Sequence, residues 1–172
     1  MEELAARAAE ESEVLDAVIA ALSSDSSIAR GWAAHVLGNM ARTVPDKVAP
    51  AARALVKLAL ERDDWVACWG LYALAELAAV RPGAVVEHLD SVGKRLVDPI
   101  VLVATRAAQV VGNVGAAHPA RAAKFIPRLR ELAEIGEHVG HVEAGKWDVR
   151  LHKDVAEEAI KKIEGPMKKK SE

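Results

Sequence analysis

The sequence predicts an all-α fold in which similar pairs of helices stack one after another. The first observation is a period of 37 residues that separates Pro45, Pro82 and Pro119. The second is that the residues before each proline recur in register, as Gly38-Asn39-Met40, Ala75-Glu76-Leu77 and Gly112-Asn113-Val114. The third is the composition, 51% hydrophobic but only 3% aromatic. A core made mainly of alanine and aliphatic residues suits packed helices better than sheets, and a fixed period of this size is typical of stacked supersecondary units.

The second repeat shows the expected pattern of two helices. Ala52, Leu55, Val56 and Ala59 have helical spacing and are followed by the polar stretch 61–64. We expect Asp63 or Asp64 to cap the next helix. The apolar face of that helix is Val66, Gly70, Ala73, Leu74 and Leu77. Arg81-Pro82-Gly83 should end it, because the residue before a proline avoids the helical conformation.

The first and third repeats follow the same pattern. The first has helix positions Leu15, Val18, Ile19 and Leu22, a turn over 23–27, and then Ala33, Val36, Leu37 and Met40. The third has Leu89, Val92 and Leu96, followed by Ala107, Val110, Val111 and Val114. Asp98-Pro99 is expected to open its second helix, with proline near the first turn.

The fourth repeat departs from the period. Its first helix is predicted from Ile126, Leu129, Leu132 and Ala133, and its second from Ala156, Ala159, Ile160 and Ile163. The second helix matches the third repeat only after a step of 49 residues, so about twelve extra residues lie near 136–148. Gly140 and Gly145 favour a loop there, and Gly165-Pro166 is expected to end the last helix.

These patterns predict one domain over 1–172. It begins with a helical extension or cap at 1–13, followed by repeats at about 14–50, 51–87, 88–124 and 125–165, and it ends in a flexible tail at 166–172.

The segment 29–40, Ala-Arg-Gly-Trp-Ala-Ala-His-Val-Leu-Gly-Asn-Met, resembles the second-helix consensus of HEAT-like repeats. It has the hydrophobic-arginine opening, the Ala-Ala pair and the Leu-Gly step. The resemblance extends from about Val14 to Ile163. It implies a HEAT/armadillo-type α-solenoid, a right-handed α-α superhelix of about four two-helix repeats whose second helices line the concave side. Tetratricopeptide repeats fit less well, because their period is 34 residues.

Charge and cysteine content limit the location and the partners. The formal net charge is −2, from 23 basic and 25 acidic residues, and nothing in that balance demands nucleic acid or an anionic membrane. Cys68 is the single cysteine, so an internal disulfide is impossible and a reducing compartment is favoured. The acidic start Met1-Glu2-Glu3 has no apolar segment after it, which argues against a signal peptide. The apolar stretch 65–75 is too short to span a bilayer. We therefore expect a cytoplasmic protein.

Some HEAT-like proteins are enzymes, but this sequence lacks their metal ligands. The resemblance to deoxyhypusine hydroxylases would require His-Glu pairs at positions occupied here by Gly31-Trp32, Cys68-Trp69 and Thr105-Arg106. A strongly basic stripe, as in HEAT-like DNA glycosylases, is also missing. His138 and His141 could share a metal if their segment were coiled, but a polar loop with glycines is the favoured explanation, and no metal site is predicted. Cys68 has no base in view and is expected to be unreactive.

The function predicted from the sequence is therefore a non-enzymatic scaffold that binds a protein or peptide, with no cofactor. Aromatic and arginine residues most often anchor interfaces. The predicted partner-binding residues on the concave face are Trp32, His35, Asn39, Trp69, Tyr72, Glu76, Arg106, Gln109 and Asn113.

Several alternatives stay open. Trp32 and Trp69 could instead fill gaps between repeats in the core. The chain could also be a small metal- or ligand-dependent enzyme with the 136–148 loop as a lid, or a nucleic-acid-binding protein. A third possibility is that it assembles with itself through a terminal helix.

Overall fold

The computed structural model describes residues 2–135, 138–143 and 146–168, and within 138–143 and 146–151 it describes the backbone alone. The described part consists of helices and one β-hairpin. The α-helices are α1 (Glu2–Glu10), α2 (Ser12–Ala21), α3 (Ser27–Ala41), α4 (Pro45–Val48), α5 (Ala52–Ala59), α6 (Asp64–Val80), α7 (Leu89–Gly93), α8 (Val101–Ala117), α9 (Pro119–Ala122), α10 (Ile126–Glu134) and α11 (His152–Lys168). Short 3-10 turns cover Ala49–Ala51, Pro82–Ala84, Val86–His88, Lys94–Val97 and Ala123–Phe125. The strands are β1 (His138–Glu143) and β2 (Lys146–Leu151).

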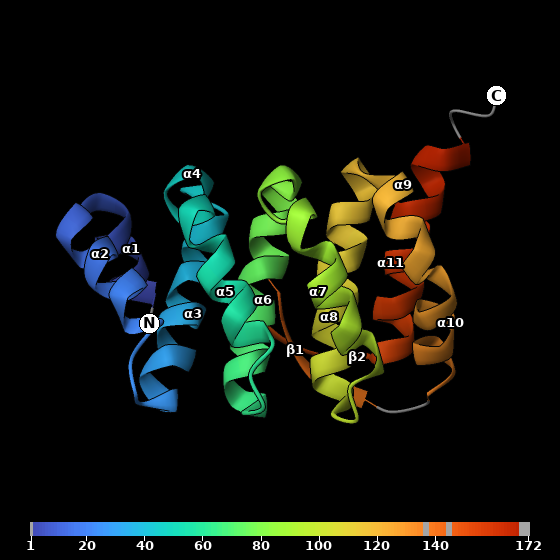
Figure 1. Ribbon diagram of the computed structural model, residues 1–172, viewed down its shortest axis with the longest axis horizontal. Coiled ribbons are helices and arrows are strands. Elements are labelled where there is room, and N and C mark those ends of the chain that lie inside the picture. The colour runs from blue at the N-terminus through green and yellow to red at the C-terminus, as the bar shows by residue number, and fades with distance from the viewer. Residues whose placement is uncertain (1, 136–137, 144–145, 169–172) are drawn as a thin grey trace.

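The helices form two layers that follow sequence order along the long axis (Figure 1). The long helices α3, α6, α8 and α11 form one layer, in which α3 packs against α6, α6 against α8, and α8 against α11. The shorter helices form the other layer, where α5 packs on α6 and α10 on α11. The face of the long helices turned away from the shorter ones is called the second-helix face below. The prediction of a helical architecture is confirmed.

Local sequence signals explain where these helices begin. The Ser26 hydroxyl accepts the Ala29 N–H at 3.3 Å, and the Asp63 carboxylate accepts the Val66 N–H at 3.2 Å. Asp63 is thus the cap of α6, as one of the two expected residues. Pro45 and Pro119 occupy the first position of α4 and α9, where the missing proline N–H costs nothing. The periodic prolines therefore mark the starts of the first helices.

Glycines let the long helices approach closely. A Cβ on Gly38 would lie 2.5 Å from a ring carbon of Tyr72 on the neighbouring helix. A Cβ on Gly112 would lie 2.7 Å from the Cα of Ala159 on α11. The repeated glycine of the motif is thus a packing residue, and it allows a core built largely of alanine, valine and leucine.

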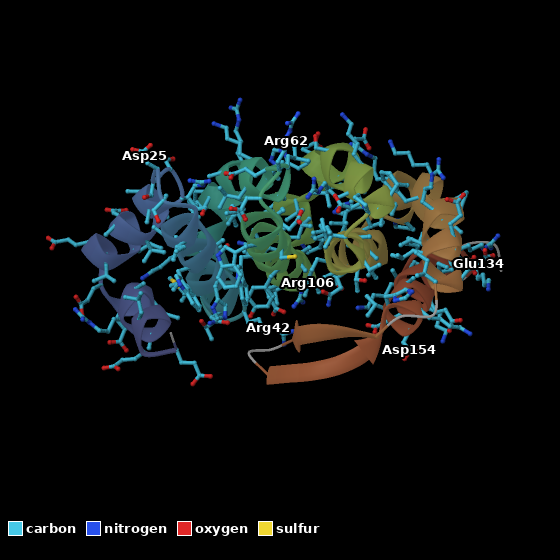
Figure 2. The ribbon with its side chains drawn as sticks, turned by 90° about the horizontal axis from the view of Figure 1, so that it is seen from below. Asp25, Arg42, Arg62, Arg106, Glu134 and Asp154 are labelled. Carbon is cyan, nitrogen blue, oxygen red and sulfur yellow. The ribbon has the colours of Figure 1, made fainter. Side chains whose placement is uncertain are left out.

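The insert differs from the prediction. The segment expected to be a loop over 136–148 contains β1 and the first half of β2. The two strands pair antiparallel in a register that joins His138 with Leu151 and Glu143 with Lys146. Residues 136–137 and 144–145 lie outside the described residues. β1 contacts α8 and β2 contacts α11, and Figure 2 shows the hairpin on the same side as the labelled Arg42 and Arg106. The insert therefore lies over part of the second-helix face. A loop, as predicted from Gly140 and Gly145, would leave the backbone N–H and C=O groups of this segment without partners, whereas pairing of the two strands satisfies them.

Three predicted boundaries also change. Helix α8 begins at Val101 rather than at Asp98-Pro99, because the Asp98 carboxylate accepts the Ile100 N–H at 2.9 Å and holds a turn before the helix. Helix α11 continues beyond Gly165-Pro166 to Lys168, since a proline in the last turn removes one hydrogen bond without reversing the backbone.

The N-terminal extension is a separate helix, α1, that buries Ala5 and Ala8 and contacts α2 and α3. No helix in the described part of the chain is long and apolar enough to cross a membrane.

Candidate functional site

An aromatic cluster joins α3 to α6 on the second-helix face. Trp32 and His35 come from α3, and Trp65, Trp69 and Tyr72 come from α6. The His35 and Trp69 rings are stacked with centroids 4.2 Å apart. Trp65 meets Trp32 edge-on at 5.5 Å and Trp69 edge-on at 5.3 Å. Edge-to-face and offset arrangements of this kind contribute beyond the burial of area alone, so the cluster stabilises the contact between α3 and α6.

The glycine spacing of α3 makes room for this cluster. The ideal Cβ of Gly31 would overlap the Trp65 indole, and that of Gly38 would overlap the Tyr72 ring. Trp65 and Tyr72 therefore lie directly on the backbone of α3, two helical turns apart. Trp32 keeps 39% of its surface exposed and Trp65 keeps 41%, whereas Tyr72 is 1% exposed. The cluster is consequently buried at Tyr72 and open at the two outer tryptophans.

Polar side chains on the same face connect neighbouring helices. The Tyr72 hydroxyl donates to Asn39 at 2.7 Å, and Arg42 pairs with the buried Glu76. The Asn113 amide donates to the Ala75 carbonyl at 2.9 Å. These contacts span α3–α6 and α6–α8, and they satisfy groups that would be costly to bury alone.

Arg106 and Lys162 extend the same network. The Arg106 guanidinium donates to Gln109 at 2.9 Å and lies 5.4 Å from the centroid of the Tyr72 ring, a cation–π geometry. The Lys162 ammonium donates to the Asn113 amide oxygen at 2.9 Å, which links α8 to α11. Charged groups on this face thus help to align the helices.

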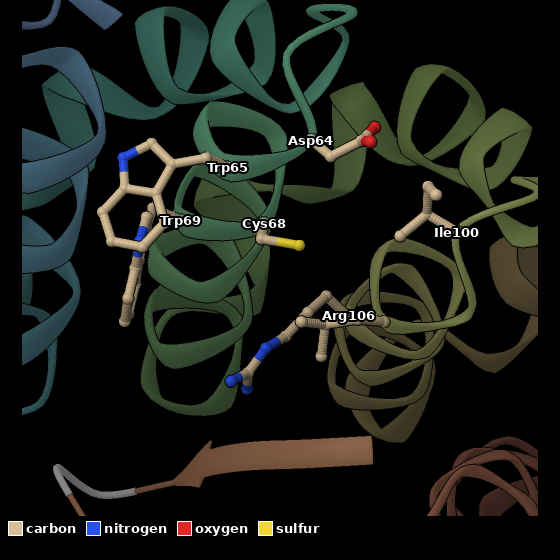
Figure 3. Close-up of a pocket in the computed structure, with 7 residues that line it drawn as sticks. Asp64, Trp65, Cys68, Trp69, Ile100 and Arg106 are labelled. Carbon is tan, nitrogen blue, oxygen red and sulfur yellow. The ribbon is translucent and has the colours of Figure 1, made fainter. Parts of the chain in front are cut away.

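An apolar pocket opens between α6 and α8 beside the cluster. Its volume is about 260 Å³, and its lining is Asp64, Trp65, Cys68, Trp69, Ile100, Leu102 and Arg106. Figure 3 shows Cys68 between the two helices, with Ile100 facing it from the start of α8. The same view shows Asp64 and Arg106 on opposite sides of the pocket. The pocket can therefore receive an apolar group and offers opposite charges at its two margins.

Burial shifts the pKa of three groups in or beside the cluster, which are Cys68, Tyr72 and His35. Desolvation raises the pKa of the Cys68 thiol to about 11, although the Arg106 charge acts in the opposite direction. Desolvation also raises the pKa of Tyr72, with a further contribution from Glu76. The pKa of His35 is lowered, first by desolvation and then by the positive charges of the N-terminus and Arg106. At neutral pH Cys68 is a neutral thiol, Tyr72 a neutral phenol and His35 a neutral imidazole.

The structure brings the nine predicted partner-binding residues to one face but gives them different surroundings. Tyr72, Glu76 and Arg106 are buried. Asn39, Gln109, Asn113, His35 and Trp69 are half-buried. Trp32 is the one member of the set whose side chain is exposed. Most of the predicted set therefore connects adjacent helices, and the accessible part of the face lies around Trp32.

Sequence reasoning missed the residues that open this face to solvent. These residues lie about one helical turn or slightly more before the predicted Trp69 and Arg106, and they are Asp64, Trp65, Ile100 and Leu102. One signal was available: the 37-residue period places an apolar residue at the start of α3, α6 and α8, as Ile28, Trp65 and Leu102.

The metal candidates His138 and His141 belong to β1. Their segment is extended rather than coiled, so the condition under which they were expected to share a metal is not met; their side chains lie outside the described part of the structure. Among the residues that the structure describes, no group of three or more His, Cys, Asp or Glu side chains could hold a metal ion.

Comparison with known proteins gives the fold but no function. No protein-family model matches the sequence, and no curated protein matches it either. Several crystal structures of engineered proteins are similar. One has a TM-score of 0.69 at 21% identity over 94% of this chain and 70% of that one. A second has a TM-score of 0.72 at 20% identity over 87% and 63%. A third has a TM-score of 0.66 at 21% identity over 94% and 42%. At this identity the likeness shows the fold alone, and the chain spans only part of each of these proteins.

Proposed function

We propose that this chain is a non-enzymatic, cytoplasmic scaffold that binds a partner protein or peptide on the second-helix face. In this proposal the helix pairs are about four HEAT-like repeats of a right-handed α-solenoid, and the second-helix face is its concave side. The resemblance of residues 29–40 to the HEAT consensus supports the repeat assignment.

One observation carries the proposal: the exposed indoles of Trp32 and Trp65 adjoin an apolar pocket of about 260 Å³. Tryptophan is enriched among the residues that dominate binding energy, because it combines large apolar area with a polar group. A pocket next to exposed aromatic residues accepts an anchor side chain. The hydrogen bonds that join α3, α6 and α8 keep the site preorganised, which reduces the entropic cost of binding.

Selection from a random peptide library displayed on phage tests the proposal. Peptides that bind the wild-type protein should lose binding to Trp65→Ala and retain it for Val80→Ala. Val80 is the matched control because it is exposed to a similar degree, 43%, at the opposite end of the same helix. Circular dichroism must show that both variants keep the wild-type helix content. Selected peptides that bind both variants equally, or a library that yields no binders, would contradict the proposed site.

A further inference from the structure

The β-hairpin interrupts the stack of helices. It is an insertion into the 37-residue period, and α8 and α11 pack directly on each other beside it. The ideal Cβ of Gly112 on α8 would lie 2.7 Å from the Cα of Ala159 on α11, so these two helices meet at their backbones. The hairpin is therefore not needed to join the last two repeats.

One edge of the hairpin is open. In the described part of the chain the sheet consists of β1 and β2 alone, so each strand has one edge without a partner strand. β1 packs against α8, whereas β2 packs mainly against α11, the helix that directly follows it. In Figure 2 the arrow of β2, which ends at α11, lies farther from the long helices than that of β1. The edge of β2 is thus the one that faces away from the helices.

We propose that two copies of this chain associate through this edge, with their β2 strands paired antiparallel around Val149. An open edge carries a row of unpaired backbone donors and acceptors that can pair with another strand. The two hairpins then form one sheet of four strands in the order β1, β2, β2 and β1. A two-stranded hairpin is marginally stable alone, and additional strands stabilise it. The inference does not rest on the proposed function, because neither Trp32 nor Trp65 takes part in the pairing.

The sequence of β2 is complementary to itself in this register. Residues directly opposite each other lie on the same face of the sheet, where opposite charges and large apolar pairs are favourable. Pairing around Val149 places Asp148 opposite Arg150 of the second copy, and the two-fold symmetry repeats this ion pair. It also places Trp147 opposite Leu151, again twice. Five residues of each strand, 147–151, are therefore matched.

Neighbouring registers lack this match. Pairing around Asp148 would place two aspartates opposite each other and Lys146 opposite Arg150, and like charges in these positions are destabilising. Pairing around Trp147 would leave only three residues of each strand in the ladder, 146–148. A shift by one residue would bring charged positions opposite apolar ones. The pattern of β2 therefore favours one register.

Other charges near the edge do not oppose the pairing. Lys146 lies outside the five matched residues and is opposite Glu143 in the register of its own hairpin. Lys153 follows the strand at the start of α11 and pairs with Glu157 at 3.8 Å. Figure 2 shows Arg106 on the side of the hairpin that β1 occupies. The charge of the open edge is therefore set mainly by the two residues that pair between the copies.

Sedimentation equilibrium tests the association at protein concentrations from about 10 μM to about 500 μM, because so small a contact should give a weak dimer. The wild-type chain should show a reversible monomer–dimer equilibrium. Asp148→Arg brings arginines opposite each other and Arg150→Asp brings aspartates opposite each other, so each should weaken the dimer about tenfold or more. The variant with both substitutions restores opposite charges and should dimerise like the wild type. An equimolar mixture of the two single variants should also dimerise.

A cysteine at the two-fold axis tests the register. The two Val149 residues are opposite each other, and the Cα atoms of opposite residues in an antiparallel pair are about 4.5–5.5 Å apart, within reach of a disulfide. Val149→Cys should therefore form a covalent dimer under mild oxidation. Val139→Cys, on β1, is the matched control and should remain monomeric on a non-reducing gel. Both variants retain Cys68, so Cys68 cannot account for a difference between them.

Several outcomes overturn the inference. These are a wild-type chain that stays monomeric at about 500 μM, a dimer that both single charge variants keep, and equal cross-linking of the two cysteine variants. Circular dichroism must show the wild-type helix content, and where a single charge variant misfolds, the double variant and the cross-linking decide. The phage selection for Trp65-dependent peptides is a separate measurement, so the proposed function can fail while the dimer stands, and the reverse.

Discussion

Replacing Gly38 with alanine tests whether close helix approach holds α3 against α6. On an isolated helix this change would be stabilising by about 1 kcal/mol, because glycine is the weaker helix former. In the folded protein the new Cβ would lie 2.5 and 2.7 Å from two carbons of the Tyr72 ring and 3.2 Å from the Cα of Ala73. Ordinary carbon contacts are about 3.5–4.0 Å, so the ring would have to move by roughly 1 Å.

The Tyr72 ring has little freedom to make that movement. Its side chain is buried, its hydroxyl donates to Asn39 at 2.7 Å, and Trp69 meets it edge-on at 5.6 Å. Overpacking a well-filled core costs about 1–3 kcal/mol, and weakening the hydroxyl bond adds about 1 kcal/mol. After the propensity gain of about 1 kcal/mol, we expect a net destabilisation of about 1–3 kcal/mol. For a chain of this size each kcal/mol lowers the melting temperature by about 2–4 °C.

Thermal and urea unfolding followed by circular dichroism would measure this loss. Gly83→Ala is the matched control, because nothing lies within 4 Å of its ideal Cβ and its φ is outside the left-handed region. That variant should be neutral or stabilised by about 0.4–1 kcal/mol. If Gly38→Ala is as stable as Gly83→Ala, α3 and α6 do not approach as closely as described, and the explanation for the repeated glycine is refuted.

Three further predictions concern the same helices. Leu74→Ala removes a fully buried side chain from α6 and should cost about 2–5 kcal/mol in urea unfolding; a loss below about 1 kcal/mol would place Leu74 outside the core. The pKa of His35 is lowered in the folded state, so the unfolded chain binds more protons below about pH 6.5, and stability should fall as the pH drops from 7 through that value. His35→Asn should flatten that part of the pH profile, and an unchanged slope would show that another group is responsible. With a thiol pKa of about 11, Cys68 should react with iodoacetamide at pH 8 much more slowly in the native protein than in 6 M urea, whereas equal rates would contradict its burial.

The sequence predicted helices well because the period repeats local signals that act independently of the fold. Asp63 caps α6 and the prolines start α4 and α9 through contacts within a few residues. The hairpin could not be predicted in the same way. Its strands are short, β1 contains a glycine, and the two pair with each other over the surface of α8 and α11, so their conformation depends on tertiary context. The sequence excess of twelve residues showed where the insert is, but not what it forms.

The candidate site was predicted only in part for a related reason. Helical spacing correctly placed Trp32, Trp69 and Tyr72 on one face, but it cannot tell which residues on that face meet the next helix. Gly38 determines that Tyr72 meets the neighbouring helix, because the missing side chain lets the backbone of α3 contact the tyrosine ring. Trp65 lies over Gly31 in the first turn of α6, where the neighbouring helix covers only one side of the indole.

Gly38 and Gly31 therefore have different consequences along one helix interface. Near the middle of α3 and α6 the close approach buries Tyr72 and its hydrogen bond to Asn39, which fixes the spacing of the two helices. Near their starts the contact leaves Trp65 and Trp32 in ring contact yet 41% and 39% exposed. A rigid interface that ends in open aromatic surface presents its indoles at a fixed separation, and fixed geometry reduces the entropic cost of binding. If the proposed function is right, packing and binding on this face both depend on the contact between α3 and α6, so Gly31→Ala should impair both together, whereas Asp64→Asn should affect binding alone.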